Sequence, residues 1–410
     1  MNDSNREFDV IVVGATGFTG ALVAEYLCER YGVGGELRWA AAGRSHEKLE
    51  ALQATLGPGA ASLPLIVANT LDAQSVRDLA RRTRVILTTV GPYARYGSEL
   101  VAACAESGTH YCDLAGEVQW IKRMIDAHDS DAKKSGARIV HCCGFDSIPM
   151  DIGAWFLQQE AHKRYGTYCD SVLLLVKAMK GGASGGTMAS MMNLMREARE
   201  DREVARVLAR PYSLNPEGEQ RGPDTGDQRG VRFEDDARSW TAPFIMASVN
   251  TRVVRRSHAL LGYPWGADFR YHEAIRTGHG MAGWLRAATI TGGLTGLVLL
   301  ASFGWTRDLL ERFVLPKPGT GPDAEARDKG FFNLEQIGRF ADGRRIRSRI
   351  TGDRDPGYGS TSKMLAESAV CLALDELDSE GGVLTPAAAM AAPLIERLTK
   401  NAGLAFEIRD

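Results

Sequence analysis

Residues 8–20 read FDVIVVGATGFTG, and this stretch decides the fold of the N-terminal part of the chain. Residues 8–13 are a short apolar, β-branched run, which predicts a strand. Glycines follow at positions 14, 17 and 20, and apolar residues then recur at helical spacing between Leu22 and Leu27. A strand, a glycine turn and a helix in this order let the backbone approach a pyrophosphate at a helix N-terminus.

The spacing of these glycines points to a particular cofactor. They follow the pattern G-x-x-G-x-x-G, which is common in proteins that bind NADP(H), and not the usual G-x-G-x-x-G. We therefore expect the cofactor to contact Gly14, Thr16, Gly17, Phe18 and Gly20. A tight strand-to-helix turn without a ligand is the alternative, but the flanking strand and helix are the context that a binding site requires.

The end of the second expected strand, residues 37–42, favours NADP(H) over NAD(H). An enzyme that uses NAD usually has Asp or Glu near this point to bind the ribose 2′-hydroxyl group. This chain has Arg44 with Ser45 beside it, and a guanidinium can bind a 2′-phosphate through two hydrogen bonds. Alternatively, Arg44 only caps or solvates the end of the strand. Asn69 follows a third expected strand at residues 63–68, where it would either reach the adenine or cap a turn.

The fourth expected strand, residues 85–89, leads into the sequence VGPY at residues 90–93. Ligands of a doubly wound sheet lie at the carboxyl ends of such strands. We therefore expect Gly91 and Pro92 to bring the backbone close to the nicotinamide. Tyr93 is a candidate for substrate contact or proton donation, and a role as a wall of the pocket explains it equally well.

Two carboxylates follow later strands. Asp113 ends a short strand that begins at His110, and Asp146 follows a strand at residues 138–141. Asp146 sits where an acid could face the nicotinamide, but capping of the next helix by Asp146 or Ser147 is favoured, since Asp and Ser are common N-cap residues. Together with Tyr93, the two carboxylates are the candidate proton donors. The alternation of strands and helices predicts a Rossmann-like, doubly wound parallel α/β sheet.

The composition is that of an ordinary globular chain. The 410 residues are 44% hydrophobic and 24% charged, which is enough material for two or three domains. A formal net charge of −2 argues against nucleic acid as a partner. The seven cysteines form no C-x-x-C pair, so we expect a reduced, cytoplasmic compartment and no metal site. The first seven residues are polar and lack an apolar signal core.

The pattern changes near Asp170, and we expect two domains. Residues 1–145 would form an NADP-binding domain that C-terminal helices within residues 360–410 complete, because the helix predicted from Ser360 needs an apolar partner. Residues 146–359 would form an α+β domain that faces the substrate or a lipid. A glycine-rich loop at residues 181–187 would bind a phosphate, act as a lid or form a plain hinge.

Residues 287–306 are the most unusual stretch of the chain. They contain no charged side chain, and Trp284 and Trp305 lie near the two ends, as aromatic residues do around membrane-interface segments. About 20 residues suffice to span a bilayer. Four glycines and several threonines make the stretch only moderately apolar. Three interpretations remain open: a pair of core helices, an apolar surface that docks on lipid, and a membrane span.

Several motifs, taken together, resemble those of a known family. The chain resembles the saccharopine dehydrogenase-like oxidoreductases in five motifs, which are GATGFTG at residues 14–20, AGRS at 42–45, VGPY at 90–93, YCDLAGE at 111–117 and GFDSIP at 144–149. Within that group, it resembles the mycobacterial trans-acting enoyl reductases in two further motifs, PKPGTGP at residues 316–322 and GVLTPAAAM at 382–390. The resemblance covers nearly the whole chain.

The resemblance implies an NADPH-dependent reduction of a carbon–carbon double bond in a polyketide or fatty-acyl lipid intermediate, which a separate synthase would carry. It does not imply saccharopine dehydrogenase activity. Such an enzyme would stabilise the enolate that follows hydride addition and would protonate its α-carbon. We expect a cytoplasmic protein that lies peripherally at the inner face of the plasma membrane. The alternative is a lipid- or membrane-associated protein that keeps the nucleotide fold but catalyses nothing.

Overall fold

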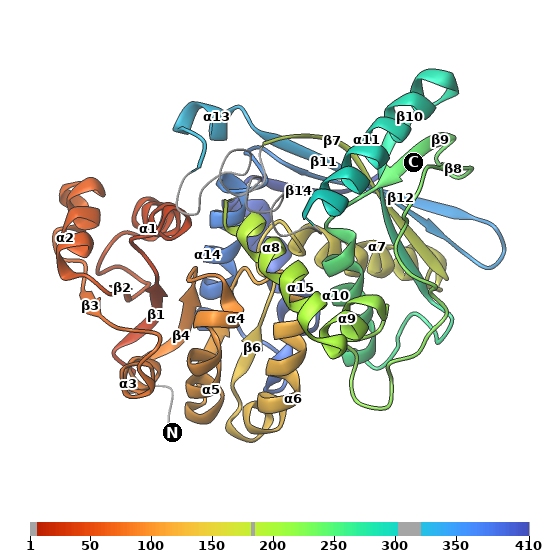
Figure 1. Ribbon diagram of the computed structural model, residues 1–410. Helices are drawn as coiled ribbons and strands as arrows, with labels where there is room; N and C mark the ends of the chain where they lie inside the picture. Colours follow the sequence, from red (N-terminus) through yellow and green to blue (C-terminus); the bar gives the residue numbers. More distant parts are fainter. Residues whose placement is uncertain (1–5, 182–184, 302–320, 410) are drawn as a thin grey trace.

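The computed structural model describes residues 6–181, 185–301 and 321–409, which form two seven-stranded sheets with helices between and around them (Figure 1). The first sheet is built almost wholly from the N-terminal part of the chain, and the second sheet from later residues. The predicted combination of a parallel sheet with a second α+β region is confirmed.

Neighbouring strands of the first sheet are all parallel, in the order β13-β6-β5-β4-β1-β2-β3. These strands are β1 (Phe8–Val13), β2 (Trp39–Gly43), β3 (Leu65–Val67), β4 (Thr83–Thr88), β5 (His110–Cys112), β6 (Arg138–Val140) and β13 (Gly382–Leu384). The helices that alternate with them are α1 (Phe18–Tyr31), α2 (His46–Thr55), α3 (Ala73–Arg82), α4 (Tyr93–Tyr96), α5 (Ser98–Ser107), α6 (Val118–Ser135) and α7 (Ile148–Tyr165). This is the predicted Rossmann-like, doubly wound arrangement.

The strand register brings distant loops to one edge of the parallel sheet. Val13 of β1 pairs with Ala42 of β2 and with Thr88 of β4, so these strands end side by side. Every residue of β1 is buried, as expected for a parallel strand that helices cover on both faces. The turns that begin at Gly14 and Thr89 therefore meet at the carboxyl edge of the sheet, where this fold binds ligands.

The second sheet is mixed, with the order β14-β12-β11-β7-β10-β9-β8, and only β7 and β10 pair in parallel. Its strands are β7 (Ser171–Lys180), β8 (Arg232–Glu234), β9 (Ser239–Pro243), β10 (Arg270–Gly278), β11 (Phe331–Arg339), β12 (Arg345–Gly352) and β14 (Leu404–Arg409). Its accompanying helices are α8 (Gly185–Glu200), α9 (Arg202–Ala209), α10 (Ala247–Leu260), α11 (Gly280–Ala301), α13 (Ala324–Asp328), α14 (Gly359–Leu374) and α15 (Pro386–Asn401).

Helix α14 returns to the first sheet. It is almost wholly buried and contacts β1, β4 and β5 as well as α1 and α15. The hydroxyl groups of Tyr26 and Tyr31 on α1 donate hydrogen bonds of 2.5 and 2.7 Å to the buried carboxylate of Glu367 on α14. On α15, Arg397 pairs with Asp375 at 2.5 Å. The C-terminal helices thus cover one face of the parallel sheet.

Helix α11 packs beside β9 and β10 and extends away from the rest of the molecule (Figure 1). Of its 22 residues only Gly283, Ala287 and Ala301 are buried, whereas Leu285 and Leu299 are 53% and 58% exposed. Among the described residues, it is the one helix that is long and apolar enough to cross a membrane. Its exposure does not fit the interpretation as a pair of core helices.

Three predicted segments fall partly or wholly outside the described residues. They are the end of the apolar stretch at residues 302–306, most of the PKPGTGP motif at residues 316–320, and residues 182–184 of the glycine-rich loop.

Candidate active site

The glycine turn after β1 has no room for a side chain at two of its positions. Gly14 has a φ angle of +84°, and a Cβ atom there would lie 2.6 Å from Cγ2 of Val90. A Cβ atom on Gly20 would lie 2.1 Å from the carbonyl oxygen of Gly14. The two glycines let α1 begin directly against the turn, while Thr16 and Gly17 are exposed on its outer side.

Helix α1 presents open backbone N–H groups at its start. Gly17 is the N-cap, and no side chain caps the helix, so the N–H groups of its first turn have no partner within the helix. These groups and the helix dipole stabilise an anion such as a pyrophosphate. Phe18 packs edge-on against Tyr358 at the start of α14, with ring centroids 4.8 Å apart. The turn is thereby held against the C-terminal helices.

The residues predicted for the adenosine end lie after β2 and β3. Arg44 is exposed and forms no ion pair within the described part of the chain. Ser45 is the N-cap of α2, and its hydroxyl accepts a hydrogen bond from the N–H of Lys48. Asn69 is exposed, and its side-chain oxygen accepts a hydrogen bond from the N–H of Leu71, which forms a turn. Of these three residues, Arg44 is thus the one whose whole polar group is accessible to a ligand.

An apolar cavity of about 360 Å³ lies beside the glycine turn, at the carboxyl ends of the parallel strands. Gly17 and Phe18 line it from the turn, and Gly91 and Pro92 line it from the end of β4. Its other wall comes from later residues, which are Met179, Met191, Leu194, Phe244, Ile245 and Met246. The predicted nicotinamide end of the site therefore opens into an apolar chamber.

Asp146 is the predicted catalytic carboxylate that lines this cavity. Its side chain is half-buried and forms no hydrogen bond or ion pair with a described residue, and burial raises its pKa to about 6. The predicted capping role is wrong. Ser147 is the N-cap of α7, no side chain caps that helix, and the Ser147 hydroxyl donates to Asn250 instead. An unpaired carboxyl group with such a pKa can exchange a proton near neutral pH.

Tyr93 also lines the cavity, but its hydroxyl group is engaged elsewhere. It donates a hydrogen bond to the carbonyl of Thr88 at 3.2 Å and accepts one from the N–H of Leu114 at 3.1 Å. Its ring stacks on Trp120, its backbone N–H donates to the buried carboxylate of Glu117, and burial raises the pKa of its hydroxyl well above the usual value. These contacts favour Tyr93 as a wall that joins the loops after β4 and β5.

Asp113 lies behind the cavity and is fully buried. Its carboxylate accepts a hydrogen bond from the Tyr111 hydroxyl at 2.9 Å and others from the backbone N–H groups of Ala115 and Cys142. Nδ1 of His141 lies 2.7 Å from the same carboxylate. Cys142 lines the cavity and Asp113 does not. The position of Asp113 thus favours fixing the loops after β5 and β6 over contact with a substrate.

Known proteins are similar to this chain in fold and in sequence. The saccharopine dehydrogenase (L-Glu forming) of Saccharomyces cerevisiae superimposes with a TM-score of 0.54 at 12% identity, over 98% of this chain and 99% of that chain. A family model described as the saccharopine dehydrogenase NADP-binding domain matches residues 10–140. The chain is 42% identical over 416 residues to a Mycobacterium tuberculosis relative, with 97% of each chain covered. It is 41% identical over 413 residues to the trans-acting enoyl reductase of Mycobacterium bovis, and 40% over 414 residues to that of Mycobacterium ulcerans.

The chain belongs to the trans-acting enoyl reductase family.

NADP is the cofactor of this reductase, and its residues fit that group. Side chains at Gly14 and Gly20 would clash with Val90 and with the carbonyl of Gly14, so these glycines keep the turn tight and set the start of α1 where a pyrophosphate binds in this fold. The first turn of α1 is open, and Arg44 offers an unpaired guanidinium where a 2′-phosphate is expected. The roles of the individual site residues stay predictions. Within the described ranges, no group of three or more His, Cys, Asp or Glu side chains is placed to hold a metal ion.

Sequence reasoning missed the part of the reductase that forms this other, apolar wall of the cavity. This wall comes from α8 and from the segment between β9 and α10, which the sequence did not connect to the site. A usable signal was present in the run MASMMNLM at residues 188–195, because flexible methionine side chains are common at adaptable apolar binding surfaces.

Proposed function

We propose that this reductase uses NADPH to reduce the carbon–carbon double bond of an enoyl thioester whose acyl chain is long and apolar and is carried by a separate synthase. The observation that carries the proposal is the apolar cavity, which touches the glycine turn at Phe18 and the end of β4 at Gly91 and holds the unpaired carboxyl group of Asp146. The names of the relatives support the same reaction type.

When bound, NADPH would supply the hydride for the β-carbon of the enoyl thioester. The apolar wall at Met191, Leu194 and Phe244 would hold the acyl chain and exclude water from the reacting atoms. Protonated Asp146 would then give its proton to the α-carbon. An apolar chain beside Asp146 would raise the pKa of this carboxyl group further, since it removes remaining water. Tyr93 would keep the adjoining loops in place.

The test is NADPH oxidation by the purified reductase with an enoyl thioester. We expect turnover to be faster with a long acyl chain than with a four-carbon chain, because only the long chain reaches the apolar wall. The saturated thioester of the same length is the control and should give no oxidation. Binding of NADPH without turnover of any enoyl thioester would instead support a lipid-binding protein without catalytic activity.

We further propose that α11 docks on the cytoplasmic surface of a membrane without crossing it. The support is its exposed apolar surface, which includes Leu285, Leu299 and Leu300, and the lack of any acidic residue within α11. The helix packs on β9 and β10, and its buried Ala301 contacts Met188 and Met192 of α8, so one side of the helix is already held by the protein. Such placement would bring the cavity close to the lipid environment from which an apolar acyl chain arrives.

A further inference from the structure

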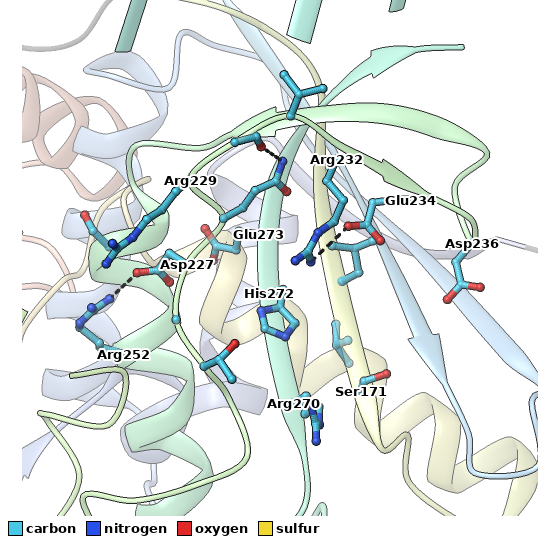
Figure 2. A pocket seen from close by; sticks show the side chains of 18 of the residues that line it. Ser171, Asp227, Arg229, Arg232, Glu234, Asp236, Arg252, Arg270, His272 and Glu273 are labelled. Atoms are coloured by element: carbon cyan, nitrogen blue, oxygen red, sulfur yellow. Dashed lines mark hydrogen bonds and ion pairs between the residues drawn. The ribbon is translucent and has the colours of Figure 1, made fainter. Parts of the chain in front are cut away.

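A second cavity, of about 870 Å³, is bordered by the second sheet and is lined mainly by polar and charged side chains (Figure 2). Its lining includes residues at the start of β7 and β10, residues 225–232, and Arg252 of α10. Ser248, in the first turn of α10, lines this cavity and also the apolar cavity of the candidate active site. The two cavities are therefore adjacent.

Two arginines lie on either side of a serine at one end of the polar cavity. Ser171 of β7 pairs with Arg270 of β10 on one side and with Arg339 of β11 on the other. Paired residues on neighbouring strands point to the same face, and strands lie about 4.8 Å apart, so the two arginine Cα atoms are about 10 Å apart across the serine. Figure 2 shows Arg270 and Ser171 next to each other. We call these three residues the arginine row.

The backbone fixes the arginine row. The N–H of Arg270 donates to the carbonyl of Asp170 at 2.9 Å, and the N–H of Asp170 donates to the carbonyl of Arg339 at the same distance. Both arginine side chains are exposed to the cavity and form no ion pair with a described residue. A hydroxyl group between two guanidinium groups on fixed strands is an arrangement that suits a phosphate, since Arg binds phosphate oxygens through paired hydrogen bonds.

The acidic side chains of the cavity do not neutralise this row. Asp227 pairs with Arg252 at 2.9 Å, and Glu234 pairs with Arg232 at 3.7 Å (Figure 2). Glu273 is fully buried, and burial raises its pKa to about 8, so this carboxyl group is mostly uncharged at neutral pH. The cavity therefore carries a net positive charge at the arginine row.

Three further residues of the lining complete the charge balance. Asp236 pairs with Arg345, which does not line the cavity. His272 lies beside Asp224 at 3.3 Å, and burial lowers the pKa of this imidazole, so it adds little positive charge at neutral pH. Arg229 is a third exposed arginine of the lining without an ion pair among the described residues. The unpaired charge of the cavity is cationic.

We infer that the arginine row binds the phosphate ester at the far end of the thioester substrate, while the acyl end lies in the apolar cavity. The inference rests on the proposed function and names the part of the substrate that the polar cavity recognises. A synthase or coenzyme carries its thioesters on a long arm that ends in a phosphate, so one such molecule has the same order of apolar and anionic parts as the two adjacent cavities. Ser248 marks the point where the arm passes between them.

The test compares two thioesters of the same unsaturated acyl chain in the NADPH-loaded enzyme. One is the 4′-phosphopantetheine thioester, and the other is the N-acetylcysteamine thioester, which has no phosphate. In the variant Arg270→Ala/Arg339→Ala, we expect the KM for the phosphorylated thioester to rise by about tenfold or more, because charge-assisted hydrogen bonds are lost. The KM for the other thioester and both kcat values should not change. Arg81→Ala is the control for the loss of an exposed arginine that does not line the cavity, since Arg81 lies on α3 and pairs there with Asp78.

Equal effects of the double variant on both thioesters would overturn the inference. Calorimetry with free 4′-phosphopantetheine gives a second readout that does not need turnover: binding by wild type and loss of binding in the double variant are expected. If wild type reduces neither thioester, the proposed function fails, and this titration still decides the anion site. If inorganic phosphate alone binds the row as tightly as 4′-phosphopantetheine does, the site serves a free phosphate and the assignment to the substrate arm is wrong.

Discussion

Arg44 is the side chain that distinguishes NADPH from NADH in the proposed site. It is exposed and has no ionic partner among the described residues. In Arg44→Ala, we expect the Kd for NADPH to rise by about tenfold or more, since each charge-assisted hydrogen bond to the 2′-phosphate contributes about 1.5–3 kcal/mol. The Kd for NADH, which lacks this phosphate, should hardly change. Calorimetric titration of both cofactors into both proteins measures the effect, and equal affinities of the wild type for NADPH and NADH would contradict it.

Asp146 is the residue through which pH should act on catalysis. Its carboxyl group has a pKa of about 6 and must be protonated to act as an acid, so the wild-type kcat/KM should fall as pH rises above about 6, and kcat should fall at a higher pH, because the bound acyl chain raises this pKa. Asp146→Asn has the same size but no such proton. We expect it to lose about a hundredfold or more in kcat, and to lose the pH dependence as well. Steady-state profiles between pH 5 and about 9 give both values, and an unchanged rate would exclude Asp146 as the proton donor.

The same substitution should not harm stability. The pKa of Asp146 is raised in the folded protein, so between the two pKa values the folded state binds more protons than the unfolded state. The free energy of unfolding contributed by this group therefore falls as pH rises from about 4 to about 6. Asn carries no charge and avoids this loss, so thermal unfolding near pH 7.5 should occur at the same or a higher temperature in the variant. This separates a catalytic defect from a folding defect.

The error about capping at Asp146 and Ser147 has a geometric cause. A side chain caps a helix when the N-cap residue has an extended backbone, as Ser45 does with φ −123° and ψ 119°. Ser147 has φ −148° and ψ −30°, which turns its hydroxyl away from the helix N–H groups. Residue type before a helix predicts that a cap is available, but the preceding loop decides the backbone angles. The sequence therefore predicted that this loop lies at the site, but it did not predict where the side chains of the loop point.

At the scale of elements, local patterns predicted the first sheet except for its edge strand β13, and missed most of the second sheet. The strands of the parallel sheet are apolar runs that end in glycine turns or caps, so each can be found by itself. Strand β12 alternates between buried Ile346, Ser348 and Ile350 and partly exposed arginines. Its pairing with β11 and with the C-terminal strand β14 joins distant segments. Such pairing depends on the rest of the fold, which local patterns do not contain.

Helix α11 is the element that should bind lipid. Leu299→Asp places a charge on its exposed apolar surface, so we expect the variant to fold normally but to lose most of its co-sedimentation with phospholipid vesicles. The matched control is Val67→Asp on β3, because Val67 and Leu299 are both 58% exposed. The control should bind vesicles as wild type does. Unfolding of Leu299→Asp, or wild-type protein that never sediments with vesicles, would contradict lipid docking by α11.

At the scale of the whole molecule, the C-terminal helix α14 packs against the N-terminal parallel sheet. We propose that residues 1–145 and the C-terminal helices form one folding unit, as the sequence predicted. Val10 and Val12 of β1 belong to the same buried cluster as Leu365 of α14, whereas Ile11 and Val13 face the helices on the opposite side of the sheet. Within residues 6–145, α1 and α2 cover part of this face, and α14 covers the part over β1, β4 and β5, which it contacts directly.

A fragment of residues 1–144 should therefore fail to fold as a soluble unit. Without α14, the part of the apolar face that α1 and α2 do not cover would be open to water, and Tyr26 and Tyr31 would lose their buried partner Glu367. Exposed apolar area of this extent favours aggregation. We expect the fragment to be recovered mainly as insoluble protein, and co-expression with residues 359–410 to increase its soluble yield, because the missing helices can then cover that face. Soluble yield and the cooperativity of thermal unfolding measure this. A soluble fragment that unfolds cooperatively without the C-terminal helices would show that the parallel sheet is complete by itself, and that α14 is only packed against it.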